Sequence, residues 1–542
     1  MLRFAARASG AVVVGASAAA AYVHFSYGPE TLPRIVRAYS VGIPALLAYK
    51  RVQLLGDRWR KRLGLPVDEE ANDREYEELH RRWAPLALDV ILDLRGFNLK
   101  TGQLVASNFG NVFPKTWQKT FEILLDRVPH KEFSHVRATV ERELGAPIEA
   151  HFSSFDETPI AAASIGQVHR ATLRDGRRVV VKVQYPEVEG LFRGDILAAK
   201  NFARIALPEH VAPLEEIEAQ FANEFDYCRE GQQLALVREN LAKSRAFPDI
   251  IVPAPDLKLT TKNVLVMEEV EDCEKLTTAL ERDMTFFAQQ RGMRVEDLLK
   301  EEKALNEAAL KRGELRCGPS ASEMRKWESQ VRWRNFFSSL VGIAPLHVPL
   351  NHAELMDELL RVHGHEILID GAFNGDPHPG NVLVVNAPGK NRRLALVDYG
   401  QVKILPKEQR LHLARLLVAL ARADTDATPA QQHRIAELSR AMGWATARND
   451  DAVAYLNSRL FFDRDDLLAT DGKNTQAFLE DLEARDPRVA LNRDFVLVGR
   501  ASLMLRGLGH MLNQHRSAAK AWAPIAERVL RENGEDPATV LA

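Results

Sequence analysis

The chain has 542 residues, of which 46% are hydrophobic, and its formal net charge is −2 at pH 7. This composition is sufficient for large buried cores and leaves room for several domains or one elaborated enzyme. The sequence has no cluster of basic and aromatic residues of the kind that binds nucleic acid, so no nucleic-acid partner is expected. Its three cysteines are isolated and lack metal-ligand spacing, so neither a disulfide framework nor a zinc site is indicated.

The N-terminal segment differs in character from the rest of the chain. Residues 1–64 contain ten Lys or Arg and two acidic residues, the first of which is Glu30. Arg3 and Arg7, followed by small and apolar residues, are typical of a mitochondrial presequence, with a secretory signal peptide as the alternative. The apolar run Ala11–Val23 is shorter than the roughly 20 residues that span a bilayer, so a membrane span stays open.

An amphipathic helix is predicted before position 100. Its apolar face is formed by Leu88, Ile91, Leu92 and Leu99. This helix leads into the segment Lys100-Thr101-Gly102-Gln103.

The next clear elements are two strands, Gln167–Leu173 and Arg178–Gln184, joined by a turn at Asp175-Gly176. Lys182 follows three consecutive valines in the second strand, which predicts a buried position. A buried lysine needs an anionic partner. The context VVVK is also typical of the kinase lysine that contacts the α- and β-phosphates of ATP.

The loop before this hairpin is rich in alanine, where ordinary protein kinases have a glycine-rich loop over the phosphates. Alanine lacks the backbone freedom with which glycine lets N–H groups approach a phosphate. The expected nucleotide contacts in this loop are Ala161, Ala162, Ala163 and Ser164.

A second amphipathic helix is predicted from Leu214 to Leu234. Glu230 is the candidate partner of Lys182. Glu224 lies about 120° away from Glu230 around such a helix, so it should face a different partner, whereas Asp226 and Glu230 should share one side.

A strand is predicted at Val264–Val270, and it ends in acidic residues. In a kinase-like fold this position is the hinge, where adenine bonds to the backbone. Met267 and Glu268 are therefore candidate nucleotide contacts, and a plain core role for Met267 is the alternative.

The segment NGDPHPGNVLVVNAPGKNRRLALVDYGQ, at 374–401, is the most informative in the chain. Asp376 and Asn381 precede two apolar runs separated by a polar turn, and Asp398 follows in the sequence D-Y-G. This layout is that of a kinase catalytic loop, with Asp376 as base and Asn381 and Asp398 as Mg²⁺ ligands. Hard oxygen ligands suit Mg²⁺ bound to phosphates.

The alanine loop together with D-P-H-P-G-N resembles the UbiB atypical kinases, also called the ADCK group, from about Leu88 to Leu405. The segment at 100–103 is similar to the K-x-G-Q signature of that family, and Glu224-Phe225-Asp226 is similar to its E-x-D element. The resemblance implies regulatory roles for Lys100, Gln103, Glu224 and Asp226. It also implies that Glu224 faces Lys100 or the metal ion, with pairing to Lys100 expected, and that Gln103 reaches the phosphate or metal region.

The resemblance further implies an ATP- and Mg²⁺-dependent kinase or ATPase that supports isoprenoid-quinone (ubiquinone) biosynthesis or mitochondrial lipid homeostasis. Expected partners are a membrane or isoprenoid lipid and proteins of quinone biosynthesis, at the mitochondrial inner membrane or matrix face, with the plastid as the alternative location. Two other readings remain: a nucleotide-sensing pseudokinase without turnover, and a small-molecule phosphotransferase.

The predicted fold is α+β, a bilobal protein-kinase-like fold with an N-terminal helical extension and a helical insert. Apolar helical periodicity continues after Leu405 to about Leu530. The expected divisions are a targeting or membrane segment at 1–70, the K-x-G-Q extension at 80–150, an N-lobe at 151–270, the helical insert at 271–350 and a C-lobe at 351–542.

Overall fold

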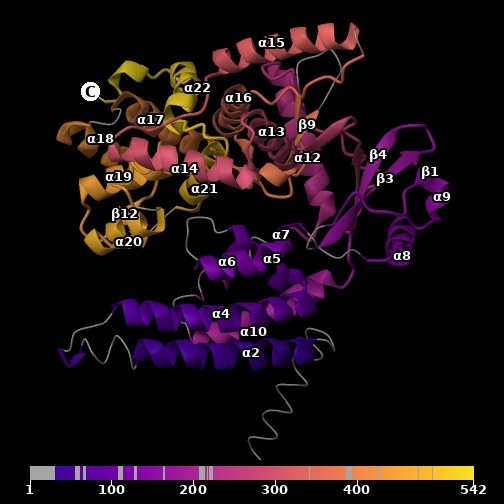
Figure 1. Ribbon diagram of the computed structural model, residues 1–542, viewed down its shortest axis with the longest axis horizontal. Coiled ribbons are helices and arrows are strands. Elements are labelled where there is room, and N and C mark those ends of the chain that lie inside the picture. Colours follow the sequence, from indigo (N-terminus) through magenta and orange to yellow (C-terminus); the bar gives the residue numbers. More distant parts are fainter. Residues whose placement is uncertain are drawn as a thin grey trace, which may run out of the picture. The chain divides into compact units, whose positions relative to one another are not determined.

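The computed structural model describes residues 31–54, 62–64, 69–107, 114–126, 131–162, 165–206, 211, 214–215, 218, 224–340, 342–385, 393–423, 427–473, 475–490 and 492–541. The chain divides into two compact units. The first comprises Met1–Gly231 and Pro255–Glu269, and the second comprises Gln232–Ala254 and Val270–Ala542. Both units combine helices with sheets (Figure 1), which confirms the predicted α+β class.

Helices build the N-terminal part of the first unit. They are α2 (Thr31–Val52), α4 (Glu69–Leu94), α5 (Gly96–Ser107), α6 (Lys115–Phe121), α7 (Ile123–Asp126) and α10 (Val188–Ala206). α2 packs on α4 and α10, and α5 packs on α4, α6, α7 and α10. Within the described residues, no helix is both long and apolar enough to cross a membrane. The apolar run Ala11–Val23 lies outside the described residues.

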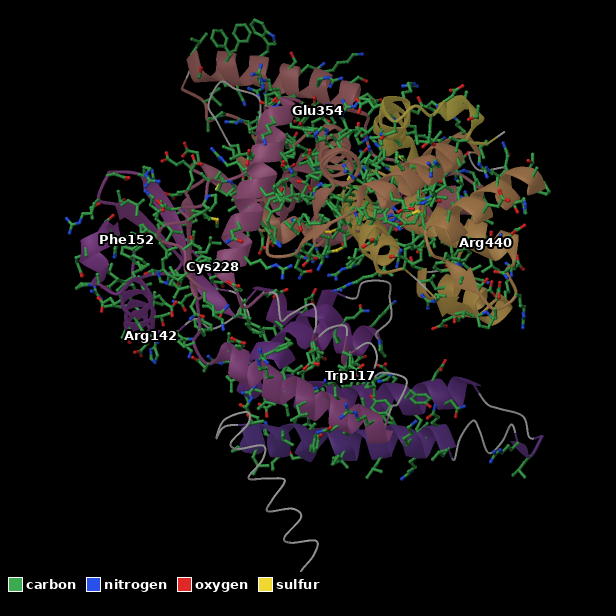
Figure 2. All side chains as sticks on the ribbon, turned by 180° about the vertical axis from the view of Figure 1, so that it is seen from behind. Trp117, Arg142, Phe152, Cys228, Glu354 and Arg440 are labelled. Carbon is green, nitrogen blue, oxygen red and sulfur yellow. The ribbon has the colours of Figure 1, made fainter. Side chains whose placement is uncertain are left out.

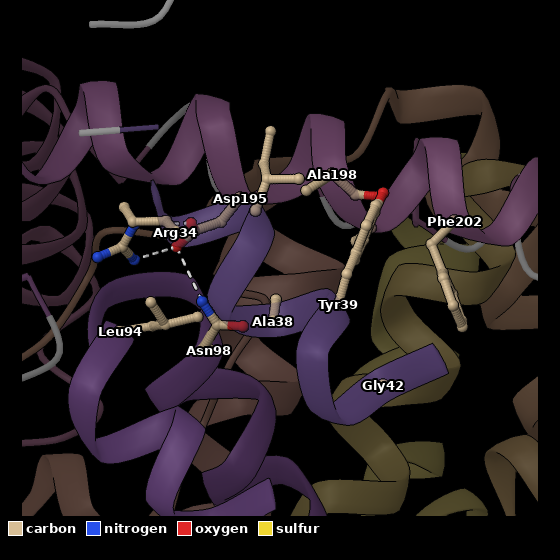
Figure 3. Close-up of a pocket in the computed structure, with 11 residues that line it drawn as sticks. Arg34, Ala38, Tyr39, Gly42, Leu94, Asn98, Asp195, Ala198 and Phe202 are labelled. Atoms are coloured by element: carbon tan, nitrogen blue, oxygen red, sulfur yellow. Dashed lines mark hydrogen bonds and ion pairs between the residues drawn. The ribbon is translucent and has the colours of Figure 1, made fainter. Parts of the chain in front are cut away.

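A buried ion pair joins α2 to α10. Nε of Arg34 donates a hydrogen bond to Oδ1 of Asp195 at 2.9 Å, and Nδ2 of Asn98 donates to Oδ2 at 2.9 Å. Burial raises the pKa of Asp195, and its hydrogen bonds to Arg34 and Asn98 oppose that shift. These groups border a cavity of about 160 Å³ that is otherwise mostly apolar (Figure 3).

The helix expected from Leu88 through Leu99 is interrupted. α4 ends at Leu94, and α5 begins at Gly96, because Arg95 has a φ of 54°, which a continuous α-helix does not allow. Leu99 is buried in the core of this region, whereas Leu92 is exposed and does not belong to the apolar face. The prediction of helical structure is therefore confirmed for α4 and for α5, whereas the prediction of one continuous helix is wrong.

An antiparallel sheet forms the rest of the first unit. Its strands are β1 (Phe152–Phe155), β2 (Ala161–Ala162), β3 (Gly166–Leu173), β4 (Arg178–Gln184) and β6 (Val264–Glu268), in the order β1-β3-β4-β6 with β2 paired to β3. α8 (Phe133–Leu144) packs on it, and α9 (Ile148–His151) precedes β1. Valines of β4 and β6 and the apolar face of α8 form one buried cluster. The hairpin predicted at 167–184 is confirmed.

α12 (Tyr227–Ser244) begins in the first unit and ends in the second. The second unit contains a sheet of order β5-β10-β9-β7 and a pair β8-β11. These strands are β5 (Ile250–Ile251), β7 (Cys273–Lys275), β8 (Ala372–Asn374), β9 (Val382–Val385), β10 (Arg393–Leu396) and β11 (Val402–Ile404). β9 and β10 are antiparallel, as the two apolar runs predict, and the turn between them lies outside the described residues.

The remaining elements are mainly helices. Residues 271–350 contain α13 (Leu276–Gln290), α14 (Val295–Lys311) and α15 (Ala321–Leu340). Next come α16 (His352–His365), the π-helical turn η3 (Glu366–Asp370) and the 3₁₀ turn η4 (Pro379–Asn381). The C-terminal part contains α17 (Lys407–Ala423), α18 (Pro429–Ala441), β12 (Ala445–Thr446), α19 (Asp451–Phe462), α20 (Thr475–Arg485), β13 (Arg488–Ala490), α21 (Arg493–Met511), α22 (Ala518–Glu532) and η5 (Pro537–Thr539).

Gly166 at the start of β3 generates a prediction about the hairpin. A Cβ atom built on Gly166 would overlap the backbone carbonyl oxygen of Val183, which is fixed in the β4 ladder. Gly166→Ala should therefore destabilise the first unit by about 2 kcal/mol, the usual range for forced overpacking. Thermal melting with hydrogen exchange of the β3 and β4 amides measures this.

Gly190 is the matched control, because it is exposed in α10 and a Cβ there meets nothing within 4 Å. Gly190→Ala should leave stability unchanged or raise it by about 0.5 kcal/mol. Equal melting temperatures of the Gly166→Ala variant and the wild type would contradict the close distance between Gly166 in β3 and the backbone of Val183 in β4.

Candidate active site

Lys182 lies in the middle of the first unit's sheet, between β3 and β6. The three valines before it are buried, as predicted. Its Nζ donates hydrogen bonds to Oε1 and Oε2 of Glu230 at 2.8 and 3.0 Å. The two side chains are 15% and 6% exposed. The ion pair expected from the sequence is therefore present, and burial makes each charge depend on the other.

The start of α12 fixes the position of Glu230. Oδ1 of Asp226 accepts hydrogen bonds from the backbone N–H groups of Cys228 at 3.0 Å and Arg229 at 3.4 Å. Asp226 is thus the N-cap, which satisfies backbone donors that the first helical turn leaves open. Tyr227, the first residue of the helix, places its ring centroid 4.9 Å from Nζ of Lys182.

The continuous helix predicted from Leu214 to Leu234 is therefore wrong. Glu224 lies in a turn before the cap, where its backbone carbonyl accepts a long hydrogen bond of 3.5 Å from Nε2 of Gln184. Asp226 and Glu230 do not share a helical face, because Asp226 stands outside the helix. Spacing alone did not reveal the cap.

The K-x-G-Q segment lies in α5, and Gly102 brings this helix close to its neighbours. A Cβ atom built on Gly102 would lie 2.5 Å from Cδ1 of Leu124 in α7 and 3.1 Å from Cδ1 of Ile91 in α4. The side chains of Lys100 and Gln103 lie outside the described residues. The pairing of Lys100 with Glu224 consequently stays a prediction.

The alanine loop is described in part. Ala161 and Ala162 form β2 and pair with Val168 and Gln167 of β3. Ala163 and Ser164 lie outside the described residues. The expected nucleotide contacts in this loop stay predictions.

The hinge candidates lie at the end of β6. Met267 is buried, whereas Glu268 is exposed. Glu269, which the sequence reasoning did not single out, accepts hydrogen bonds from Nε of Arg170 at 2.7 Å and from Nε of Arg178 at 2.9 Å. These two ion pairs tie the end of β6 to β3 and β4, immediately before the chain enters the second unit.

Asn374 organises the catalytic-loop candidate in the second unit. Its Oδ1 accepts a hydrogen bond from the backbone N–H of Asp376 at 2.9 Å, and its Nδ2 donates to the backbone carbonyl of Asp398 at 2.9 Å. One buried amide thus joins the two ends of the motif. Sequence reasoning missed Asn374, although it begins the N-G-D-P-H-P-G-N segment.

Asn381 and Asp398 belong to the same bonded framework. The backbone N–H of Val397 donates to the carbonyl oxygen of Asn381 at 3.2 Å, which places Asp398 beside this pairing. Oδ1 of Asp398 accepts a hydrogen bond from the backbone N–H of Gly400 at 3.0 Å. Nη2 of Arg500 in α21 makes a long 3.5 Å contact with Oδ1 of Asp376. Arg500 is a second residue that the sequence reasoning missed.

An amide and a carboxylate fit Mg²⁺, which prefers hard oxygen ligands and keeps further positions for phosphate and water. Asn381 and Asp398 are the residues that would hold it. Among the described residues, no group of three or more His, Cys, Asp or Glu side chains is arranged to hold a metal ion without such help.

Glu366 lies buried below this loop. Its Oε1 accepts a hydrogen bond from the Tyr399 hydroxyl at 2.9 Å, and its Oε2 accepts a weak one from the backbone N–H of Asn374 at 3.4 Å. Burial raises the pKa of Glu366 to about 7, against the opposing effect of these hydrogen bonds. The sequence signal for this residue is an acidic side chain directly before the three apolar residues Ile367–Ile369.

Comparison with known proteins places this geometry in a family context. The ABC1 atypical kinase-like domain matches residues 123–312 and 346–431, more than half of the chain. The chain is 26% identical over 377 residues to AarF domain-containing protein kinase 1 of Mus musculus, across 68% of this chain and 59% of the relative. It is 26% identical over 521 residues to probable protein kinase UbiB of Xylella fastidiosa strain 9a5c, across 92% and 78%.

A third relative is the Arabidopsis thaliana protein named ACTIVITY OF BC1 COMPLEX KINASE 7, chloroplastic. The two chains are 25% identical over 518 residues, across 93% of this chain and 62% of the relative. The chain therefore spans less than two thirds of the length of the mouse and Arabidopsis relatives.

The buried ion pair generates a prediction about stability. Glu230→Ala leaves the charge of Lys182 uncompensated, so it should destabilise the first unit by about 3–5 kcal/mol. The double variant Lys182→Met/Glu230→Leu removes both charges and should recover most of that loss. Thermal melting of the nucleotide-free protein measures both effects.

Glu239→Ala is the control, since this residue forms an exposed i,i+4 ion pair with Lys243 on the same helix and should not affect melting. A double variant as unstable as Glu230→Ala would show that packing, rather than charge, determines the effect.

Glu366 generates a prediction about pH. The native carboxyl retains its proton up to about pH 7, whereas the unfolded one loses it near 4.5, so its contribution to stability is complete below 4.5 and is lost as the pH rises through 7. The loss is of order 3 kcal/mol. Glu366→Gln, which retains an acceptor for Tyr399, should remove this contribution.

The measurement is the difference in melting between Glu366→Gln and wild type from pH 4.5 to 8. A difference is needed because burial lowers the pKa of His363 and of His515 to about 4, which makes stability rise with pH over part of the same range. Parallel profiles for the two proteins would refute the raised pKa.

Proposed function

The chain belongs to the family of ABC1 atypical kinase-like proteins, and we propose that it binds ATP with Mg²⁺ and catalyses phosphoryl transfer or ATP hydrolysis. The family inferred from the sequence motifs is thereby confirmed. A kinase-like enzyme agrees with this family and with relatives named as protein kinases.

The observation that carries the proposal is the Lys182–Glu230 ion pair. A buried ion pair is a poor way to gain stability, because two apolar side chains of similar size would usually be at least as stable. A lysine held by a carboxylate in the centre of a strand is, however, what phosphate binding in a kinase requires. We therefore assign Lys182 to the α- and β-phosphates and Glu230 to its orientation.

The loop in the second unit supplies the remaining groups. Asp376 would accept the proton of the attacking hydroxyl or water, as a carboxylate within reach of the nucleophile can. Asn381 and Asp398 would hold Mg²⁺, which when bound neutralises charge on the terminal phosphates. Asn374 would position Asp376 and Asp398 through the hydrogen bonds described above, and Glu366 would support Asn374.

The acceptor follows from the K-x-G-Q helix. α5 is fixed by close packing at Gly102 and by the buried residues Leu99 and Val105, and the family resemblance assigns to this helix the exclusion of protein substrates. The acceptor is then water or a small molecule. Support of isoprenoid-quinone biosynthesis in mitochondria, with a lipid and quinone-biosynthesis proteins as partners, completes the proposal.

Asp398 tests the metal assignment. Asp398→Asn removes the carboxylate that supplies most of the charge to Mg²⁺, so it should lower Mg²⁺-dependent ATP turnover and affinity by about a hundredfold, the usual effect of losing a strong electrostatic contact. Phosphate release and calorimetric titration of ATP, each with and without Mg²⁺, measure this.

Asp471→Asn is the matched control, because Asp471 is exposed, has a φ of 53° and tolerates asparagine in that conformation. Unchanged Mg²⁺-ATP affinity in Asp398→Asn would refute the site. Mg²⁺-ATP binding by the wild type without phosphate release, with or without added lipid, would favour the pseudokinase alternative.

A further inference from the structure

α15 has two apolar faces, and only one of them is buried. Met324 and Val331 lie on the buried side, and the ring of Trp327 packs against that of Phe286 in α13, with 5.7 Å between centroids. Asn335 continues this side and fixes the chain that follows the helix. Its Nδ2 donates to the backbone carbonyl of Leu346 at 2.8 Å, and its Oδ1 accepts from the Leu346 N–H at 2.7 Å.

The opposite side of α15 carries large apolar residues that are exposed. Four of them lie at helical positions i, i+3, i+4 and i+7, and a fifth lies beyond the end of the helix. Their exposed fractions are between 56% and 68%: Trp333, Phe336, Phe337, Leu340 and Ile343. We call these five residues the α15 stripe. Figure 2 shows aromatic side chains standing out from one end of this helix.

The stripe is an ordered surface. The rings of Trp333 and Phe337 stack at 6.0 Å between centroids, and those of Phe336 and Phe337 meet edge to face at 5.5 Å. The N–H of Ile343 donates to the carbonyl of Ser338 at 2.9 Å, a helix-ending pattern in which Gly342 has a φ of 72°. This turn ends α15 and fixes the backbone of Ile343, the last residue of the stripe.

Positive charge borders the stripe. Arg332 and Arg334 flank Trp333, and at about 100° per residue they lie on opposite sides of the stripe. Arg332 also forms an ion pair with Glu328 one turn earlier, at 2.8 Å between Nη2 and Oε1. α15 carries four basic and two acidic side chains, a net charge of +2, whereas the whole chain has a net charge of −2: Arg325, Lys326, Arg332 and Arg334 against Glu323 and Glu328. An apolar helix face edged by arginines is therefore a local departure from the composition of the chain.

We propose that the α15 stripe is a docking surface for an anionic lipid bilayer. Trp and Phe side chains favour the boundary between headgroups and acyl chains, and arginines beside them can reach lipid phosphates while their stems stay in the apolar layer. A single convex helix face suits a soft planar surface better than a protein partner, which needs an extended complementary interface. The proposal is independent of the phosphoryl-transfer assignment.

The test is co-sedimentation of the full chain with vesicles of phosphatidylcholine, alone or mixed with phosphatidylglycerol. Trp333→Ser/Phe337→Ser should lower partition into the mixed vesicles by about tenfold or more, since two large apolar side chains are lost. Arg332→Gln/Arg334→Gln should abolish most of the preference for the mixed vesicles. Val489→Ser/Met511→Ser, which removes two other exposed apolar side chains, should bind as wild type.

Quenching by brominated phosphatidylcholine tests insertion at one residue, whatever other segments contribute to binding. In mixed vesicles, part of the tryptophan fluorescence of the wild type should be quenched, and Trp333→Phe should lose that part while binding equally well. No difference in quenching between these two proteins, or equal partition of wild type and Trp333→Ser/Phe337→Ser, would overturn the proposal. The proposal would also be overturned if the wild type were a dimer, the Trp333→Ser/Phe337→Ser variant were a monomer, and the two bound vesicles equally.

Discussion

The ion pair of Lys182 and Glu230 is the constraint on which the candidate site depends. It places a charge among the buried valines of β4, and burial of both side chains makes that charge costly without its partner. The position of Glu230 is in turn fixed by the Asp226 cap, which sets where α12 begins. Lys182 and Glu230 both belong to the first compact unit, so this contact joins β4 of that unit to the first turn of α12.

In the second unit, the neutral side-chain amide of Asn374 fixes the positions of the candidate site residues. Asn374 holds the backbone at Asp376 and at Asp398 with two hydrogen bonds of 2.9 Å, and the buried Glu366 braces Asn374 and Tyr399 from below. Preorganised groups of this kind matter for phosphoryl transfer, in which positioning and electrostatics supply most of the catalysis. The backbone at the candidate base Asp376 and at the candidate metal ligand Asp398 is therefore held by side chains that have no direct role in the proposed chemistry.

Local patterns in the sequence predicted the elements that depend on local physics. The β3–β4 hairpin follows from an Asp-Gly turn between valine-rich segments, and the β9–β10 pair from two apolar runs. The same reasoning failed where a single residue interrupts the helical periodicity. Asp226 caps the start of α12 inside the helix predicted from Leu214 to Leu234, and Arg95, with its positive φ, separates α4 from α5. Asn374 also bonds to Asp376 two residues on, but its link to Asp398 spans 24 residues and that of Glu366 to Tyr399 spans 33, and such long-range partners cannot be predicted from local patterns. Helical spacing likewise does not distinguish an exposed apolar face, such as the α15 stripe, from a buried one.

Labelling of the purified chain with an acyl-phosphate derivative of ATP tests the central claim most directly, because this reagent transfers its acyl group to a lysine amine that contacts the nucleotide phosphates. The account predicts that peptide mass spectrometry finds the label on Lys182, that labelling increases with Mg²⁺ and that excess ATP blocks it. A label on other lysines only, or labelling of Lys182 that excess ATP does not reduce, would contradict the assignment of Lys182 to the phosphates.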